Sequence, residues 1–80
     1  MNASDSELLT TGYTALAEAH TLGGTLFDKV KTSQELGQPV ATAESLTLIR
    51  GTREQLQKAV CAFSALESRA LGNKPPKLGD

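Results

Sequence analysis

Two long stripes of apolar residues, stepping mostly by three and four positions, constrain this chain more than any other feature. Such spacing marks one face of an α-helix, and its period of about 3.5 residues is typical of helices packed side by side. The first stripe comprises Leu9, Tyr13, Leu16, His20, Gly23, Phe27 and Val30, and the second comprises Leu46, Ile49, Arg53, Leu56, Val60, Phe63, Leu66 and Ala70. The pattern therefore predicts an all-α protein built from two long helices.

Capping and turn residues indicate where these helices begin and end. Ser4 followed by Glu7 has the form of a capping box, and Gly37 suits the left-handed residue that follows a helix end. Pro39 prevents a helix from continuing, and Thr42 is a good N-cap for the next one. The predicted bounds are about 5–36 and 43–71, with a flexible tail over 72–80, all in a single helical domain over 1–80.

A short connection between two helices of similar length predicts an antiparallel hairpin. With a turn near residue 39, position n lies opposite roughly 79 − n. Gly23-Gly24 is the weak point of the first helix, because each glycine costs about 1 kcal/mol relative to alanine. A kink, a break into two helices and a close contact with another backbone all fit this pair. Two helices alone bury too little apolar surface to offset chain entropy, so we expect hairpins to assemble into an oligomeric bundle.

Charge and cysteine content exclude several classes of protein. The chain of 80 residues carries 8 basic and 9 acidic side chains, whereas a DNA or RNA binder needs a large basic excess. Cys61 is the only cysteine, which rules out a disulfide within one chain. The single cysteine, together with the lack of an export signal over residues 1–6, predicts a cytoplasmic protein. No apolar run approaches the roughly 18 residues of a membrane span, so no membrane association is expected.

Catalytic machinery is not expected. His20 is the only histidine, so no second one can join it in a metal site or proton relay, and its stripe position predicts a packed or interface histidine. Cys61 lies in an apolar segment and is expected to be buried as a small hydrophobic residue. The carboxylates show no paired or metal-ligand spacing, and Gly23-Gly24 lacks the Lys-Ser/Thr of a P-loop. We therefore predict no enzyme activity, no metal and no cofactor.

Basic residues gather on the expected hairpin. The predicted register brings Lys29 and Lys31 toward Arg50 and Arg53 near the connection. Two interpretations stay open, a solvated surface and a pocket for an anion such as phosphate. Arg53 favours the pocket, because it lies on an apolar stripe where a guanidinium needs a partner. Tyr13, the only tyrosine, is either part of the core or a surface on which a flat ligand such as a base stacks.

Two segments are similar to one protein family. The segment from Thr11 to Glu18 (TGYTALAE) resembles the "TGY, two residues, Leu, small, acidic" start of the phage anti-CBASS cyclic-nucleotide sponges. The segment from Arg53 to Gln57 (REQLQ) resembles the "Arg, two residues, Leu-Gln" stretch of their C-terminal helix. With the residues that follow on the same helical face, the two segments cover about a third of the chain. The chain departs from the pattern in its longer Tyr-to-Lys spacing and in Gly23-Gly24.

The resemblance implies a compact helical oligomer, a hexamer in that family, which binds a cyclic di- or trinucleotide between protomers. Such proteins hide the signal from a defence effector and leave it chemically intact. By this resemblance Tyr13, with Gly12 beside it, would stack on a base, while Lys29 and Arg53 would meet phosphates. Lys31 and Arg50, the other two residues of the basic cluster, complete the candidate ligand site. A different hypothesis is a hairpin adaptor or inhibitor that captures a protein through its apolar stripe, and a third is an oligomeric structural module without a ligand.

Overall fold

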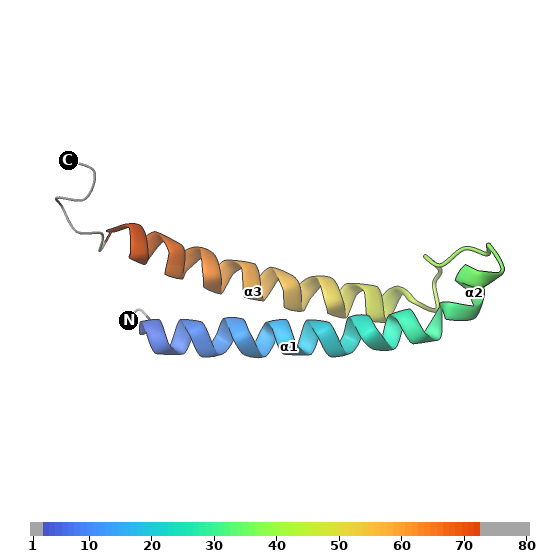
Figure 1. Cartoon of the computed structure of the whole chain (residues 1–80), viewed down its shortest axis with the longest axis horizontal. Coiled ribbons are helices and arrows are strands. Elements are labelled where there is room, and N and C mark those ends of the chain that lie inside the picture. Colours follow the sequence, from blue (N-terminus) through green and yellow to red (C-terminus); the bar gives the residue numbers. More distant parts are fainter. Residues whose placement is uncertain (1–2, 73–80) are drawn as a thin grey trace.

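The computed structural model describes residues 3–72. Its helices are α1 (Asp5–Lys29), α2 (Lys31–Glu35) and α3 (Leu46–Gly72). The long helices α1 and α3 lie antiparallel side by side, and α2 carries the connection at one end of the pair (Figure 1). Residues 3–72 contain no strand, so the predicted all-α antiparallel hairpin is confirmed. Gly72 is the last residue of α3, and the remainder of the predicted tail lies outside the described residues.

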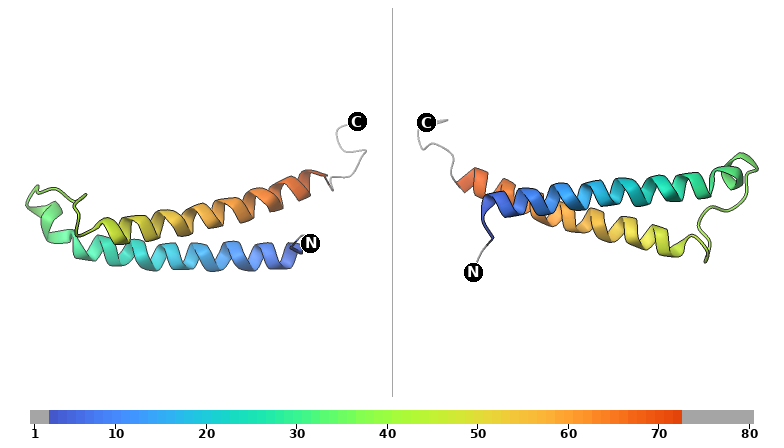
Figure 2. Two further views of the ribbon diagram at one scale, coloured as in Figure 1. Left: turned by 180° about the vertical axis from the view of Figure 1, so that it is seen from behind. Right: turned by 90° about the horizontal axis from the view of Figure 1, so that it is seen from below.

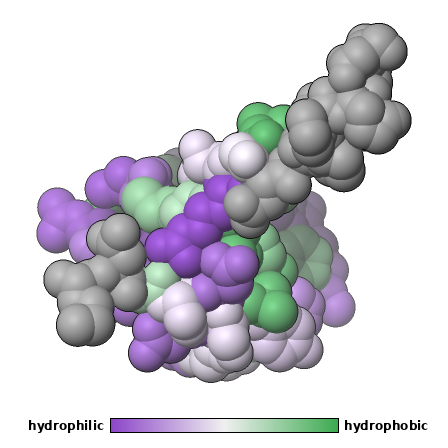
Figure 3. Space-filling model, turned by 90° about the vertical axis from the view of Figure 1, so that its left-hand side faces the viewer, coloured by the Kyte–Doolittle hydropathy of each residue, from purple (hydrophilic) through white to green (hydrophobic). Residues whose placement is uncertain are grey.

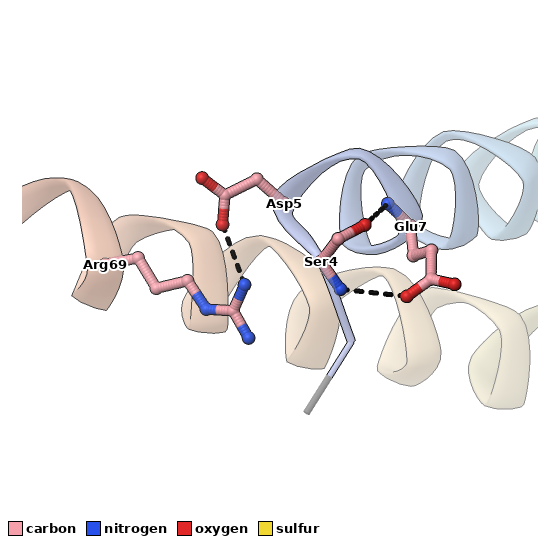
Figure 4. Close-up of polar contacts among 4 residues, drawn as sticks. All are labelled: Ser4, Asp5, Glu7 and Arg69. Carbon is pink, nitrogen blue, oxygen red and sulfur yellow. Dashed lines mark hydrogen bonds and ion pairs between the residues drawn. The ribbon is translucent and has the colours of Figure 1, made fainter. Parts of the chain in front are cut away.

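The predicted capping box is present at the start of α1. The backbone N–H of Glu7 donates to Ser4 Oγ at 3.1 Å, and the backbone N–H of Ser4 donates to Glu7 Oε1 at 2.8 Å (Figure 4). These bonds satisfy donors that the first helical turn leaves unpaired. Arg69 Nη1 donates to Asp5 Oδ1 at 2.7 Å, in the same view. This ion pair links the beginning of α1 to the last turn of α3.

The first helix ends sooner than expected, at Lys29 instead of residue 36. Val30, with φ −99° and ψ 7°, separates it from the single turn of α2. The helix ends there because Lys29 already lies level with the beginning of α3, so a longer α1 would have no helix to pack against. Of the possibilities for Gly23-Gly24, a break does not occur, since α1 continues through the pair. Gly23 instead lies beside α3.

The connection uses backbone motifs at both of its ends. Gly37 has φ 70°, as predicted for a residue after a helix end. The N–H of Gln38 donates to the Ser33 carbonyl at 2.8 Å, and the N–H of Gly37 donates to the Gln34 carbonyl at 3.1 Å. This pair of bonds forms a Schellman motif, which closes α2 and turns the chain back.

Helix α3 begins at Leu46, three residues later than predicted, because a tight turn precedes it. The backbone N–H of Thr42 donates to Ser45 Oγ at 3.0 Å, and the N–H of Ser45 donates to Thr42 Oγ1 at 3.2 Å. Ser45 Oγ also lies 2.8 Å from the Val40 carbonyl, to which it donates. Ser45 is 1% exposed, and these bonds satisfy its polar atoms inside the protein.

Contacts between α1 and α3 fix the register of the hairpin. The numbers of facing residues add up to about 74, as in Asp5 with Arg69, and Gly12 with Ala62. Position n therefore lies opposite roughly 74 − n, not 79 − n as the sequence suggested. The difference arises because the connection runs from 30 to 45 and is centred near residue 37, not near Pro39.

Small side chains form the contact between the two long helices. The buried seam comprises Gly12, Ala15 and Ala19 of α1 with Ala59 and Ala62 of α3. The distance between packed helices depends on the side chains at their contact, so glycine and alanine bring these axes close together. The predicted stripes are offset from this seam by one residue, and most of their large side chains, including Leu9, Leu16 and Val60, are exposed. The predicted packing face was therefore wrong, although Val30 is buried as expected.

The hairpin is long and thin. Its radius of gyration is 18.0 Å, whereas a compact chain of this length has one of about 12 Å. Two further views show α1 and α3 as a single pair, with no other described element covering their outer sides (Figure 2). Apolar surface therefore reaches the outside of the molecule beside polar surface, as the view onto the end where α1 begins and α3 ends shows (Figure 3).

Candidate functional site

The seam divides the exposed surface of the hairpin into two flanks. Each helical residue is rotated by about 100° from the one before it, so the residues that directly follow seam positions lie on one side of each helix. In an antiparallel pair, these two sides face the same way. We call this surface the apolar flank, formed by Leu9, Tyr13, Leu16, His20 and Phe27 of α1 and Ile49, Arg53, Leu56, Val60 and Phe63 of α3. The opposite surface, the polar flank, carries Thr11, Thr14, Glu18, Glu54, Lys58 and Cys61.

Gly12 and Tyr13 have separate structural roles. A Cβ added to Gly12 would lie 2.7 Å from Phe63 Cε2 and 3.2 Å from Ala62 Cβ, so only glycine fits here without displacement of a neighbour. Gly12 is buried in the seam and offers no side chain to a ligand. Tyr13, the next residue, is 68% exposed and shares a shallow hollow with Leu9 and Thr10. Its ring is therefore free for contact outside the hairpin and is not part of the core.

The four candidate cations are exposed and lie on different elements. Lys29 is the last residue of α1, Lys31 is the first of α2, and Arg50 and Arg53 lie on α3. By the observed register, Lys29 is level with residue 45. Arg50 and Arg53 are then about 7.5 and 12 Å further along α3, at 1.5 Å per residue. Among residues 3–72 the ion pair of Asp5 with Arg69 is the only one, so the candidate cations have no carboxylate partner there.

Tyr13 and Lys29 are far apart in one chain. They are sixteen residues apart on a continuous helix, which corresponds to about 24 Å along its axis. Lys29 also precedes Val30, a buried residue, and therefore lies toward the polar flank, whereas Tyr13 lies on the apolar flank. A single small ligand could touch both side chains only if they came from different chains.

His20 and Cys61 occupy opposite flanks. His20 is exposed on the apolar flank at the level of Arg53. Cys61 is exposed on the polar flank, where Gln57 Nε2 lies 3.7 Å from its sulfur, so its expected burial was wrong. Over residues 3–72 no three His, Cys, Asp or Glu side chains gather where they could hold a metal ion. No helix in that range is long and apolar enough to cross a membrane.

A polar hollow that the sequence did not predict spans both long helices. It is lined by Thr10, Thr11, Thr14 and Ala15 of α1 and by Gln55 and Lys58 of α3. Hydroxyl and amide groups beside one ammonium group are able to bind an anion weakly at the surface. The threonines at successive turns are the signal that could have indicated it, but it is visible only once the register places Lys58 beside them.

No family model, curated protein or solved structure matches the chain. The likeness to the anti-CBASS sponges therefore rests on the two segments around Tyr13 and Arg53.

Proposed function

We propose that the protein is a non-enzymatic sponge that sequesters a cyclic di- or trinucleotide signal as a phage counter-defence protein in the cytoplasm of the bacterial host. The observation that carries the proposal is the exposed ring of Tyr13, which the hairpin does not use for its own packing. Gly12, directly before it, allows the close contact with α3. The Gly-Tyr pair thus joins a structural glycine to an aromatic side chain that is free for a ligand.

The ligand contacts follow from general chemistry. Stacking of a base on an aromatic ring contributes about 1–3 kcal/mol, and each charge-assisted hydrogen bond to a phosphate contributes about 1.5–3 kcal/mol. The proposed cations are Lys29 and Arg53, with Lys31 and Arg50 as further phosphate contacts. Because Tyr13 and Lys29 are too far apart within one chain, the proposal includes a homo-oligomer in which the ligand lies between protomers.

Direct binding measurements test this function. Calorimetry with cyclic di- and trinucleotides should show binding, and mass spectrometry should recover the ligand intact. Tyr13→Ala and Lys29→Ala should each weaken binding at least about tenfold, which corresponds to about 1.4 kcal/mol. Both side chains are exposed, so circular dichroism should be nearly unchanged. Lys58→Ala is the matched control, because it removes a cation from the polar flank, on the other side of the hairpin from Tyr13 and Arg53, and should keep full affinity.

Two results would overturn the proposal. Full affinity in both Lys29→Ala and Arg53→Ala would remove the phosphate site. Absence of binding to any cyclic nucleotide by the unmodified protein would remove the sponge.

The second candidate is an adaptor or inhibitor that binds another protein, and the exposed apolar flank favours it. Leu56 is 44% exposed and Val60 is 56% exposed, although both belong to residue types that usually pack inside. This candidate predicts a monomeric hairpin that binds no cyclic nucleotide. Light scattering at micromolar concentration, together with the calorimetry above, separates it from the sponge.

A further inference from the structure

The apolar flank is a row of large hydrophobic side chains that the hairpin leaves exposed. The described hairpin exposes Leu56, Val60 and Phe63 in succession along one side of α3, with Leu9 and Leu16 beside them on α1. The accessible surface is 6109 Å², whereas a compact folded monomer of 8.4 kDa exposes about 4,600 Å². The excess is about 1,500 Å² over the whole chain, because a thin hairpin exposes the outer sides of both helices.

Charge is arranged symmetrically along α3. On the apolar flank the series Arg53, Leu56, Val60, Phe63 and Glu67 steps by three, four, three and four residues. Val60 is its midpoint, with a cation seven residues before it and an anion seven residues after it. Arg53 and Glu67 are about 21 Å apart along the helix and cannot pair within one chain. An antiparallel copy of α3 centred on Val60 would bring each of them opposite the other.

Four of the five α1 residues of the apolar flank are centred at the same height, and Phe27 lies beyond them. Leu9, Tyr13, Leu16 and His20 step by four, three and four residues, so their midpoint lies between Tyr13 and Leu16. The observed register places this level opposite residues 59–60 of α3. The series from Leu9 to His20 and the series from Arg53 to Glu67 therefore share one centre, as they must if each packs against its own copy about a twofold axis.

We propose that a second copy of the chain covers the apolar flank, related by a twofold axis level with Val60. In this dimer α3 packs antiparallel on α3 of the second copy, and α1 does the same on α1. Val60 meets Val60, Leu56 meets Phe63, and Arg53 pairs with Glu67 of the second copy in two reciprocal contacts. A parallel pairing of α3 would instead place Arg53 against Arg53 and Glu67 against Glu67. The dimer does not depend on the proposed ligand.

Charge reversal tests this arrangement. Arg53→Glu and Glu67→Arg each place like charges together twice in every dimer, which costs affinity strongly at an interface. Each should raise the dissociation constant of the dimer at least about tenfold, and the double variant should return it to within about threefold of the unmodified protein. The matched controls are Glu54→Arg and Lys58→Glu, which change charge equally on the polar flank and should leave assembly unchanged. Sedimentation equilibrium measures all of these against the monomer mass of 8.4 kDa.

Cross-linking gives a second measurement that does not depend on charge. In a Cys61→Ser background, Val60→Cys places one thiol per chain next to the axis, and a short bis-maleimide should join two chains. The unmodified protein, whose exposed Cys61 lies on the polar flank, should not cross-link in this way.

The outcomes are separate from those of the sponge proposal. A monomer at all concentrations, or an assembly that charge reversal leaves unchanged or that the double variant fails to restore, would overturn the dimer. A dimer that responds as expected but binds no cyclic nucleotide supports the interface and removes the sponge. A monomer that binds a cyclic nucleotide would overturn the dimer and the site between protomers, and would leave only the binding of the signal.

Discussion

Replacement of Gly12 by alanine tests the close approach of α1 and α3 directly. The added Cβ would lie 2.7 Å from Phe63 Cε2 and 3.2 Å from Ala62 Cβ, whereas carbon atoms pack best at about 3.5–4.0 Å. A methyl group forced into a packed contact costs about 1–3 kcal/mol. Alanine also gains about 1 kcal/mol over glycine in a helix interior. Gly12→Ala should therefore lower the free energy of unfolding by up to about 2 kcal/mol.

Gly24 supplies the control within the same helix. A Cβ added there meets no atom within 4 Å, so Gly24→Ala should yield only the helix-propensity gain of about 1 kcal/mol. The difference between the two variants isolates the strain at Gly12, which we expect to be about 1–3 kcal/mol. Urea denaturation followed by circular dichroism measures both, at one fixed protein concentration because association would add to apparent stability.

A double-mutant cycle attributes the strain to a particular contact. Phe63→Leu removes the ring atom nearest to the added methyl, so in that background Gly12→Ala should cost about 1 kcal/mol less. Equal stabilisation by Gly12→Ala and Gly24→Ala would refute the reasoning, because it would mean that the helices do not approach closely at Gly12.

The same denaturation assay checks three further predictions. Ser45→Ala leaves the backbone N–H of Thr42 without its acceptor and should cost about 1–3 kcal/mol; a loss below about 0.5 kcal/mol would contradict the role of the buried Ser45 side chain in this turn. Ser4→Ala removes half of the capping box and should cost about 1 kcal/mol, while an unchanged midpoint would show that the cap is not used. Asp5→Asn breaks the exposed pair with Arg69 and should cost about 0.2–1 kcal/mol, a loss that shrinks in roughly 1 M salt.

The sequence predicted the local capping and turn motifs of the fold well. The capping box of Ser4 and Glu7 and the left-handed Gly37 are confirmed, because each depends on a few neighbouring residues and on backbone geometry that those residues favour. The end of α1 and the beginning of α3 were predicted less well. The early end at Lys29 depends on where α3 begins, which is a tertiary fact that no local signal contains.

The packing face was predicted wrongly for a physical reason. A search for the most apolar stripe selects Leu9, Leu16 and Val60, whereas the seam uses alanine and glycine one position earlier. Two helices can approach closely only where their facing side chains are small, whereas a hydropathy scale ranks large apolar side chains above glycine and alanine. Because the large apolar residues lie on the outside of the hairpin, the apolar flank is the surface through which we expect the oligomer to form.

The register error affected the candidate site in the same way. A shift of about five residues moves Lys29 away from the level of Arg50, and the predicted basic cluster depended on that pairing. The seven-residue symmetry of Arg53 and Glu67 about Val60 is visible in the sequence alone. It indicates an interface between two chains only when the structure shows that this stripe lies on the outside of the hairpin.

The two proposals compete for Tyr13 and Arg53, because the dimer covers Tyr13 and pairs Arg53 with Glu67 of the second copy, and they also constrain Lys29 differently. In the proposed dimer Tyr13 lies next to the twofold axis, and Arg53 is about 10 Å from it along α3. Lys29 is about 22 Å from that axis, beyond the reach of a small ligand stacked on Tyr13 of either copy. A ligand that needs both Tyr13 and Lys29 therefore requires a second kind of interface and an assembly larger than a dimer. If the mass in solution is that of a dimer, Lys29→Ala should bind the cyclic nucleotide as tightly as the unmodified protein, and a phosphate contact of Arg53 would replace its ion pair with Glu67 of the second copy. If the assembly is larger and dissociates only to dimers on dilution, a loss of affinity in Lys29→Ala that accompanies dissociation would place Lys29 at the second interface.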